Sequence, residues 1–167
     1  MTLFFKKKTS LILKEVDFSC REFLYNLAND KDVRSNAVNT TTIPWKEHCS
    51  WFERVLKSEK ITIFILEKNG TPIGQIRFDE IGENLYEIDY ALIPEERGKG
   101  LGKWLLANSI KSIELDNINF FATVKDSNIS SKAVFESSGF TEFERFYKNE
   151  TLFIKYILKT IQTNVRK

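Results

Sequence analysis

The chain has 167 residues, of which 42% are hydrophobic, and this favours a single globular domain over 1–167 with a substantial core. Lys and Arg total 25 against 23 Asp and Glu, a formal net charge of +2 that argues against nucleic acid or a membrane surface as a partner. No apolar run approaches membrane-spanning length, and Met1 to Lys8 has its lysines after a very short apolar run, the reverse of a signal peptide. The two cysteines, Cys20 and Cys49, lack metal-ligand spacing and are typical of reduced thiols in a cytoplasmic protein.

The N-terminal part is predicted to hold one strand and two helices. Leu11 to Val16 is a short strand, after which Asp17 can cap a helix. Asp32 to Thr42 is polar and predicts a loop or a broken helix. Pro44 suits the first turn of the next helix. The apolar faces of these helices comprise Phe23, Leu24 and Leu27, then Trp51, Phe52, Val55 and Leu56.

Three strands with short turns follow, and they predict an antiparallel meander. Ile61 to Glu67 and Ile73 to Asp79 flank Asn69-Gly70, a strong hairpin signal. Glu83-Asn84 marks the next turn, and Leu85 to Ile93 is the third strand, in which aromatic and β-branched residues mix with alternating carboxylates.

The C-terminal part adds a parallel pair and a closing hairpin. Ile118 to Val124 is predicted as a strand that follows a helix, so it pairs in parallel with the preceding strand through a right-handed crossover. Ser127-Asn128 opens the last helix and Gly139 ends it. Phe140 to Tyr147 and Leu152 to Leu158 form a hairpin, and the tail from Thr160 is polar. Together these elements predict a mixed α/β (α+β) sheet of about seven strands.

The junction between Tyr86 and Gly102 carries the clearest chemical signal. A predicted strand ends at Pro94. The glycine-rich segment Arg97 to Gly102 follows, and then a helix with a broad apolar face. Helix N-termini leave N–H groups without partners, and glycines let a phosphate approach them. Arg97, Lys99 and Lys103 add positive charge. The segment therefore favours binding of a diphosphate.

Several loop types compete for this segment. The Walker pattern requires a Ser or Thr where Trp104 stands and a glycine where Arg97 stands, and the spacing of Gly98, Gly100 and Gly102 breaks the dinucleotide fingerprint. The pattern R-x-x-G-x-G after a strand is met by Arg97, Gly100 and Gly102. An ordinary glycine-rich turn is the remaining alternative.

The junction resembles the acetyl-CoA-binding motif of the GNAT superfamily of N-acetyltransferases. Asn128 to Phe140 is similar to the second motif of that family, a helix that opens on Asn and ends in Gly-Phe. The order of the elements from about Leu11 to Leu158 also matches. The resemblance implies a GNAT fold whose central sheet is splayed between its fourth and fifth strands, with acetyl-CoA bound in the wedge.

The resemblance implies two sets of cofactor contacts. The diphosphate would lie on the loop, and the pantetheine amides would pair with strand backbone near Leu92 and Ile93. Asn128 would contact the pantetheine arm, although a helix cap explains it equally well. The cofactor-binding residues expected are Leu92, Ile93, Arg97, Gly98, Lys99, Gly100, Leu101, Gly102, Asn128 and Phe135.

The resemblance also implies catalytic groups. Glu87 matches a position where some members carry a base, and Asp89 shares its strand face, although either can simply pair with Lys or Arg on a solvated surface. A backbone N–H near Leu92 would serve as the oxyanion donor. Phe135 departs from the family, because many members have Tyr there as the acid. Tyr90 and Tyr147 are the alternative candidates for the acid, unless the thiolate of coenzyme A leaves without help from an acid.

The acceptor is expected over the first two helices. The stretch from Leu27 to Phe52 resembles a subgroup with N-D-x-x-V-R and E-H-x-x-W-F patterns, which includes acetyltransferases of nucleotide-linked amino sugars. The substrate-binding residues expected are Arg34, His48, Trp51 and Arg77, against the alternatives of surface arginines, a satisfied semi-buried histidine and a packing tryptophan.

The function expected is therefore transfer of acetyl from acetyl-CoA to a primary amine of a small molecule, by an enzyme that can be a homodimer. The alternatives are a ribosomal-protein-type N-terminal acetyltransferase and a non-catalytic acyl-CoA-binding module. Phe135 is the feature that points to the last of these.

Overall fold

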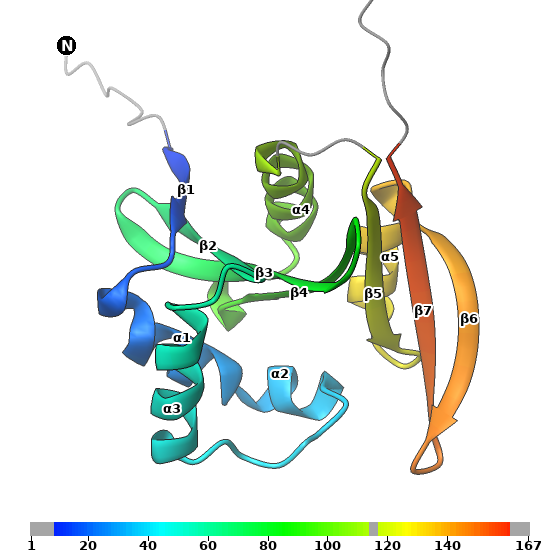
Figure 1. The fold of residues 1–167 in the computed structure, drawn as a ribbon, viewed down its shortest axis with the longest axis horizontal. Helices are drawn as coiled ribbons and strands as arrows, with labels where there is room; N and C mark the ends of the chain where they lie inside the picture. The colour runs from blue at the N-terminus through cyan, green and yellow to red at the C-terminus, as the bar shows by residue number, and fades with distance from the viewer. Residues whose placement is uncertain (1–8, 114–116, 161–167) are drawn as a thin grey trace, which may run out of the picture.

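The computed structural model describes residues 9–113 and 117–160 (Figure 1). Two predictions lie outside the described residues: that the segment from Met1 to Lys8 is no signal peptide, and that the tail beyond Thr160 is polar. The strands are β1 (Leu11–Glu15), β2 (Ile61–Lys68), β3 (Thr71–Gly82), β4 (Leu85–Leu92), β5 (Asn119–Lys125), β6 (Thr141–Lys148) and β7 (Thr151–Lys159). The helices are α1 (Arg21–Ala28), α2 (Lys31–Asn36), α3 (Trp45–Val55), α4 (Leu101–Ser112) and α5 (Ile129–Ser137), with short 3-10 turns at Phe18–Cys20 and Pro94–Glu96.

The strands form one sheet in the order β1-β2-β3-β4-β5-β7-β6. The pair β4–β5 is parallel, and all the other neighbouring pairs are antiparallel. This confirms the predicted mixed sheet of seven strands. Helix α4 makes the crossover between β4 and β5, as the strand-helix-strand pattern requires.

Local sequence explains the turns. Asn69 and Gly70 have φ of 53° and 81°, and Asn149 and Glu150 have φ of 48° and 62°. Positive φ at both central residues matches the twist of the strands on either side of a two-residue hairpin. Both predicted hairpins are thereby confirmed, and Gly139, with φ of 90°, follows the end of α5 as predicted.

The two faces of the sheet bury separate cores. Alternate residues of β2 divide between them: Phe64 and Leu66 pack with α4, whereas Ile63 and Ile65 pack with α1 and α3. Figure 1 shows α4 above the strands β2 to β4 and the pair α1 and α3 below them. Side chains on β4 consequently face either the α4 side or the α1–α3 side according to parity.

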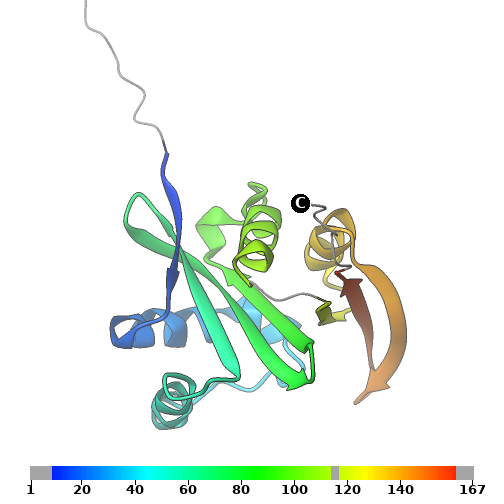
Figure 2. The ribbon, with the colours of Figure 1, turned by 45° about the horizontal axis from the view of Figure 1, so that its top comes forward.

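Strands β4 and β5 part soon after they begin. Their ladder consists of the pairs Leu85–Asn119, Tyr86–Phe120 and Glu87–Phe121, and both ribbon views show the strands β5, β7 and β6 diverging from β4 beyond that point (Figures 1 and 2). The predicted splay is confirmed. Close β3–β4 contact at the free end depends on Gly74, where an added Cβ would lie 2.5 Å from Leu92 Cδ2.

Candidate active site

A cavity of about 1060 Å³ occupies the wedge between β4 and β5 and continues beneath it to α1, α2 and α3. Its volume lies at the upper end of the range for ligand pockets, about 300–1,000 Å³. The predicted site residues that line it are Arg34, His48, Trp51, Arg77, Asp89, Tyr90, Leu92, Arg97, Gly98, Gly100, Gly102, Asn128 and Phe135. Those that do not line it are Glu87, Ile93, Lys99 and Leu101.

The glycine-rich loop presents free backbone donors. Gly98 and Gly100 have φ of 71° and 77°, and a Cβ on either would meet no atom within 4 Å. Within the described chain, the N–H groups from Gly98 to Lys103 donate no hydrogen bond, whereas the next one, Trp104 N–H, donates to the Gly100 carbonyl. The loop thus has the open approach and the donors that bind a diphosphate.

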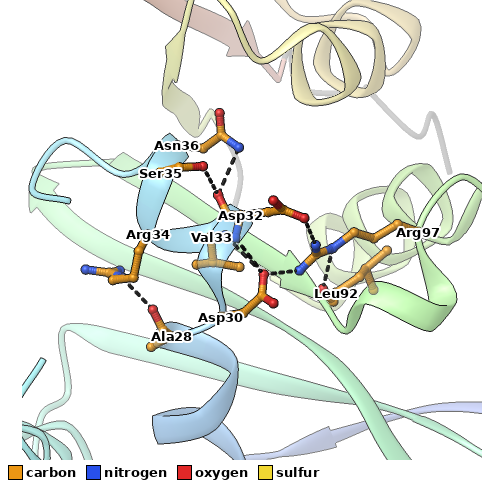
Figure 3. Close-up of polar contacts among 9 residues, drawn as sticks. All are labelled: Ala28, Asp30, Asp32, Val33, Arg34, Ser35, Asn36, Leu92 and Arg97. Atoms are coloured by element: carbon orange, nitrogen blue, oxygen red, sulfur yellow. Dashed lines mark hydrogen bonds and ion pairs between the residues drawn. The ribbon is translucent and has the colours of Figure 1, made fainter. Parts of the chain in front are cut away.

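The charged side chains of this loop point elsewhere. Figure 3 shows the Arg97 guanidinium bonded to the Leu92 carbonyl and to the carboxylates of Asp30 and Asp32. Lys99 Nζ lies 3.4 Å from Glu96, outside the cavity. Neighbouring carboxylates thus pair with both charges, and the expectation that these side chains contact the diphosphate stays a prediction.

The strand edge open to the wedge ends one residue earlier than predicted. Ile93 N–H donates to the Ile73 carbonyl at 2.9 Å, and the Leu92 carbonyl accepts from Arg97 Nε at 3.0 Å. The β4 residues that line the cavity run from Ile88 to Leu92. Ile93 and Leu101 are thus parts of the framework, and the free edge for a pantetheine lies before Ile93.

Asn128 caps α5 and also lines the cavity. Its Oδ1 accepts from Ser131 N–H at 3.2 Å and from Ser130 Oγ at 3.0 Å, which caps α5. Its amide nitrogen donates no hydrogen bond within the described residues, and the residue lines the cavity. The cap therefore leaves the amide donor free for a ligand in the wedge.

The two β4 carboxylates share a sheet face but not an environment. Asp89 lines the cavity and accepts from Gln75 Nε2 at 2.9 Å. Glu87 accepts from Thr123 Oγ1 at 3.0 Å, which joins β4 to β5 where the strands part, and it does not line the cavity. Arg77 lies opposite Asp89 in the register and pairs with Asp79 at 2.9 Å. Burial lowers the pKa of Arg77, but the carboxylates around it raise the pKa overall.

On the opposite face, Tyr90 occupies the space beside Phe135. The ring of Phe135 meets that of Tyr90 edge-on at 5.6 Å, and the Tyr90 hydroxyl donates to Ser131 Oγ at 3.3 Å. Burial raises the pKa of Tyr90 above its ordinary 10.0, so the hydroxyl stays protonated at neutral pH. Tyr147 is 73% exposed on β6 and does not line the cavity. Phe135 is 3% exposed and serves as packing for Tyr90.

The N-D-x-x-V-R residues hold the α1–α3 connection together. Asn29 bonds through both ends of its amide to the backbone of Ile43, and Asp30 caps α2. Arg34 donates through Nε to the Ala28 carbonyl and through Nη1 to the Asn39 carbonyl. Backbone carbonyls thus occupy part of the Arg34 guanidinium, and its predicted contact with substrate stays a prediction, since the residue also lines the cavity. The other residues of the pattern have a structural role.

His48 is buried and has a packing role, while its predicted contact with the substrate stays a prediction. It is 2% exposed, and its Nε2–H donates to the Arg21 carbonyl at 2.8 Å. The rings of Tyr25, Trp45, Trp51 and Phe52 surround it. Burial lowers the pKa of His48 below its ordinary 6.5, so the ring is neutral at pH 7. Trp51 borders the cavity and lies under the Arg77 guanidinium at 5.8 Å.

Helix α2 extends across the cavity and is attached on both sides. Its first turn bonds to Arg97 on the loop after β4, and near its end the Ser35 carbonyl accepts from Lys125 Nζ at 3.1 Å on β5. Sequence reasoning missed Asp30, Asp32 and Lys125 because a charge pattern does not show which distant partner it will meet. The polarity of 32–42 was the only available signal.

Comparison with known proteins identifies the family. The model of the acetyltransferase (GNAT) family matches residues 22–140, more than half of the chain. The chain belongs to this family. It is a GNAT-family N-acetyltransferase that uses acetyl-CoA. No curated protein matches it.

Solved structures agree on the fold. The spermidine N-acetyltransferase from Vibrio cholerae in complex with CoA and spermine is 19% identical, with a TM-score of 0.80 over 90% of this chain and 95% of that one. A ribosomal-protein-alanine N-acetyltransferase from Brucella melitensis is 17% identical, with a TM-score of 0.74 over 89% of this chain and 99% of that one. An aminoglycoside acetyltransferase in complex with coenzyme A is 18% identical, with 0.72 over 90% and 95%. No described helix is long and apolar enough to cross a membrane.

The burial of His48 predicts a pH dependence of stability. Its pKa is lower in the native than in the unfolded state, so the unfolded state binds a proton first as the pH falls through about 6.5. The free energy of unfolding should therefore decrease below that pH, by at most about 1.4 kcal/mol per pH unit. Urea unfolding between about pH 7.5 and about pH 5.5 measures this slope. His48→Gln should flatten the pH dependence of the free energy of unfolding. An unchanged slope in that variant would contradict its attribution to His48.

Proposed function

We propose that this enzyme transfers acetyl from acetyl-CoA, in a ternary complex, to the primary amine of a small molecule that also carries negative charge. A nucleotide-linked amino sugar is the acceptor that we favour. The observation that carries the proposal is the charge of the acceptor half of the cavity, below the sheet. We further propose that the enzyme is cytoplasmic, in keeping with the free thiols of Cys20 and Cys49.

Basic side chains predominate in that half. The basic residues that line it from α2, α3, β3 and β5 are Arg34, Lys46, Arg54, Arg77 and Lys125, against the acids Asp32, Glu47 and Asp89, of which Asp32 pairs with Arg97. Arg77 pairs with Asp79, but the other four basic residues form no ion pair within 9–113 and 117–160. Unpaired cations attract a phosphate or carboxylate and repel a polyamine. This favours an anionic amine over a polyamine such as the spermine of the Vibrio cholerae complex.

The position of α2 favours a small molecule over a protein N-terminus. The contacts of α2 with Arg97 and with Lys125 bridge the end of the wedge. An extended peptide requires a groove that is open along its length, and a bridged end shortens such a groove. The ribosomal-protein-type function therefore remains the second choice.

The chain's own residues support direct attack by an amine. When bound, acetyl-CoA supplies an activated thioester. The free N–H groups from Gly98 to Lys103 hold its diphosphate. Asp89 faces the acceptor side and accepts the proton that the amine loses, while Glu87 holds Thr123 at the point where the strands part. From the α4 side, the Tyr90 hydroxyl donates a proton to the departing sulfur.

An acceptor panel tests the proposal. Release of thiol is measured with a UDP-linked amino sugar, spermidine and a peptide with N-terminal alanine. We expect kcat/KM for the nucleotide sugar to exceed that for spermidine by about tenfold or more, and Arg54→Gln to raise its KM several-fold. Lys57→Gln, an exposed change outside the cavity, is the control. A preference for spermidine would refute the anionic acceptor, and a preference for the peptide would establish the second choice.

Asparagine and glutamine substitutions separate the two carboxylates. Asp89→Asn preserves the acceptor for Gln75 and removes the base, so kcat/KM should fall about 100-fold. Glu87→Gln keeps an acceptor for Thr123 and should cost about tenfold or less. Melting temperatures check that both variants fold. A larger loss in Glu87→Gln would reinstate Glu87 as the base.

Tyr90→Phe tests the acid. The phenylalanine ring preserves the contact with Phe135 and removes the hydroxyl, so kcat should fall about 10- to 100-fold while KM for acetyl-CoA changes little. Tyr147→Phe, on the exposed side of β6, provides the matched control. An unchanged kcat in Tyr90→Phe would mean that the thiolate leaves unassisted.

A further inference from the structure

Arg97, the first residue of the glycine-rich loop, contacts α2, the helix beside the proposed acceptor site. Arg97 extends from the loop to α2, where Nη1 bonds Asp32 at 2.7 Å and Nη2 bonds Asp30, while Nε donates to Leu92. Every nitrogen of the guanidinium thus has a partner within the protein. Asp30 is also the N-cap of α2, because its Oδ1 accepts from the N–H groups of Asp32 and Val33 (Figure 3).

The contact is charge-assisted and partly buried on both sides. The side chains of Arg97 and Asp30 are 30% and 20% exposed. Burial of Asp30 disfavours its charge, yet the hydrogen bonds from Arg97 and Val33 hold the pKa of Asp30 below its ordinary 3.8. Asp32, with 70% of its side chain exposed, contributes less.

The backbone next to Arg97 is the cofactor loop itself. Gly98 follows directly, and its N–H begins the run of free donors. A diphosphate on those donors fixes the loop, and a fixed loop fixes the base of the Arg97 side chain. Through Asp30, that constraint passes to α2, whose residues Asp32, Val33 and Arg34 line the cavity.

We infer that Arg97 is a positioning residue for α2, and not a ligand of the diphosphate, so that binding of coenzyme A stabilises the helix that closes the acceptor site. The role of α2 at the acceptor rests on the proposed function, whereas the coupling between loop and helix does not.

The test uses the full chain and coenzyme A alone, without an acceptor. Asparagine caps a helix as well as aspartate does, so Asp30→Asn with Asp32→Asn removes the two charges and keeps the cap. We expect coenzyme A to slow hydrogen exchange at residues 31–36 in the native protein and to lose that effect in the double variant. The Kd from calorimetry should change by less than about threefold in the double variant and in Arg97→Gln.

Glu96→Gln is the matched control. It removes an acid beside the same loop, where Glu96 pairs with Lys68 at 2.8 Å, but it does not touch α2. Exchange at residues 31–36 should respond to coenzyme A in this variant as in the native protein. Arg97→Lys, which keeps the charge, should restore part of the response that Arg97→Gln abolishes.

Two results would overturn the inference. A guanidinium that binds the diphosphate contributes a charge-assisted hydrogen bond to it. In that case Arg97→Gln would weaken the binding of coenzyme A about tenfold or more, and the double variant, in which Arg97 is free, would bind coenzyme A more tightly. An equal response of residues 31–36 in the native protein and the double variant would also overturn it. Neither readout depends on the identity of the acceptor, which the panel above decides separately.

Discussion

The structure depends on the early end of the β4–β5 ladder. After Glu87 and Phe121 the two strands separate, so that one edge of β4 as far as Leu92 faces a wedge, while its other edge stays paired with β3. Unpaired backbone groups inside a protein need partners, and a ligand with its own amides can supply them. The same separation joins the two faces of the sheet, so that Tyr90 on one face and Asp89 on the other border a single cavity.

Contacts at both ends of the wedge join the elements that surround it. Gly74 lets β3 approach the end of β4, and the Glu87–Thr123 hydrogen bond joins the strands where they part. Helix α2 bridges the other end through Arg97 and Lys125. The glycine-rich loop and α2 are therefore joined by direct side-chain contacts of Arg97, which accounts for a strongly paired arginine beside this loop.

Aromatic packing explains the departure from the family at Phe135. This ring packs against Tyr90, Phe140 and Tyr156, in a region where a second hydroxyl would need its own partner. The hydroxyl of the site comes instead from β4, on a residue whose burial keeps it protonated. A phenylalanine at this position is thus compatible with an acid, because the donor can come from a different element.

Sequence alone determined the elements, the hairpins, the mixed sheet and the place of the glycine-rich loop before a helix, because each follows from local rules. Asn-Gly turns, apolar periodicity and glycine before a helix act within a few residues. Asp89 and Glu87 were also placed on one face by strand alternation alone. Only the tertiary structure decided which partners Arg97, Arg34, His48 and Glu87 contact. Each depends on a partner far along the chain, such as Asp30 for Arg97 or Thr123 for Glu87, and the distance between two such residues is a property of the fold and not of their spacing.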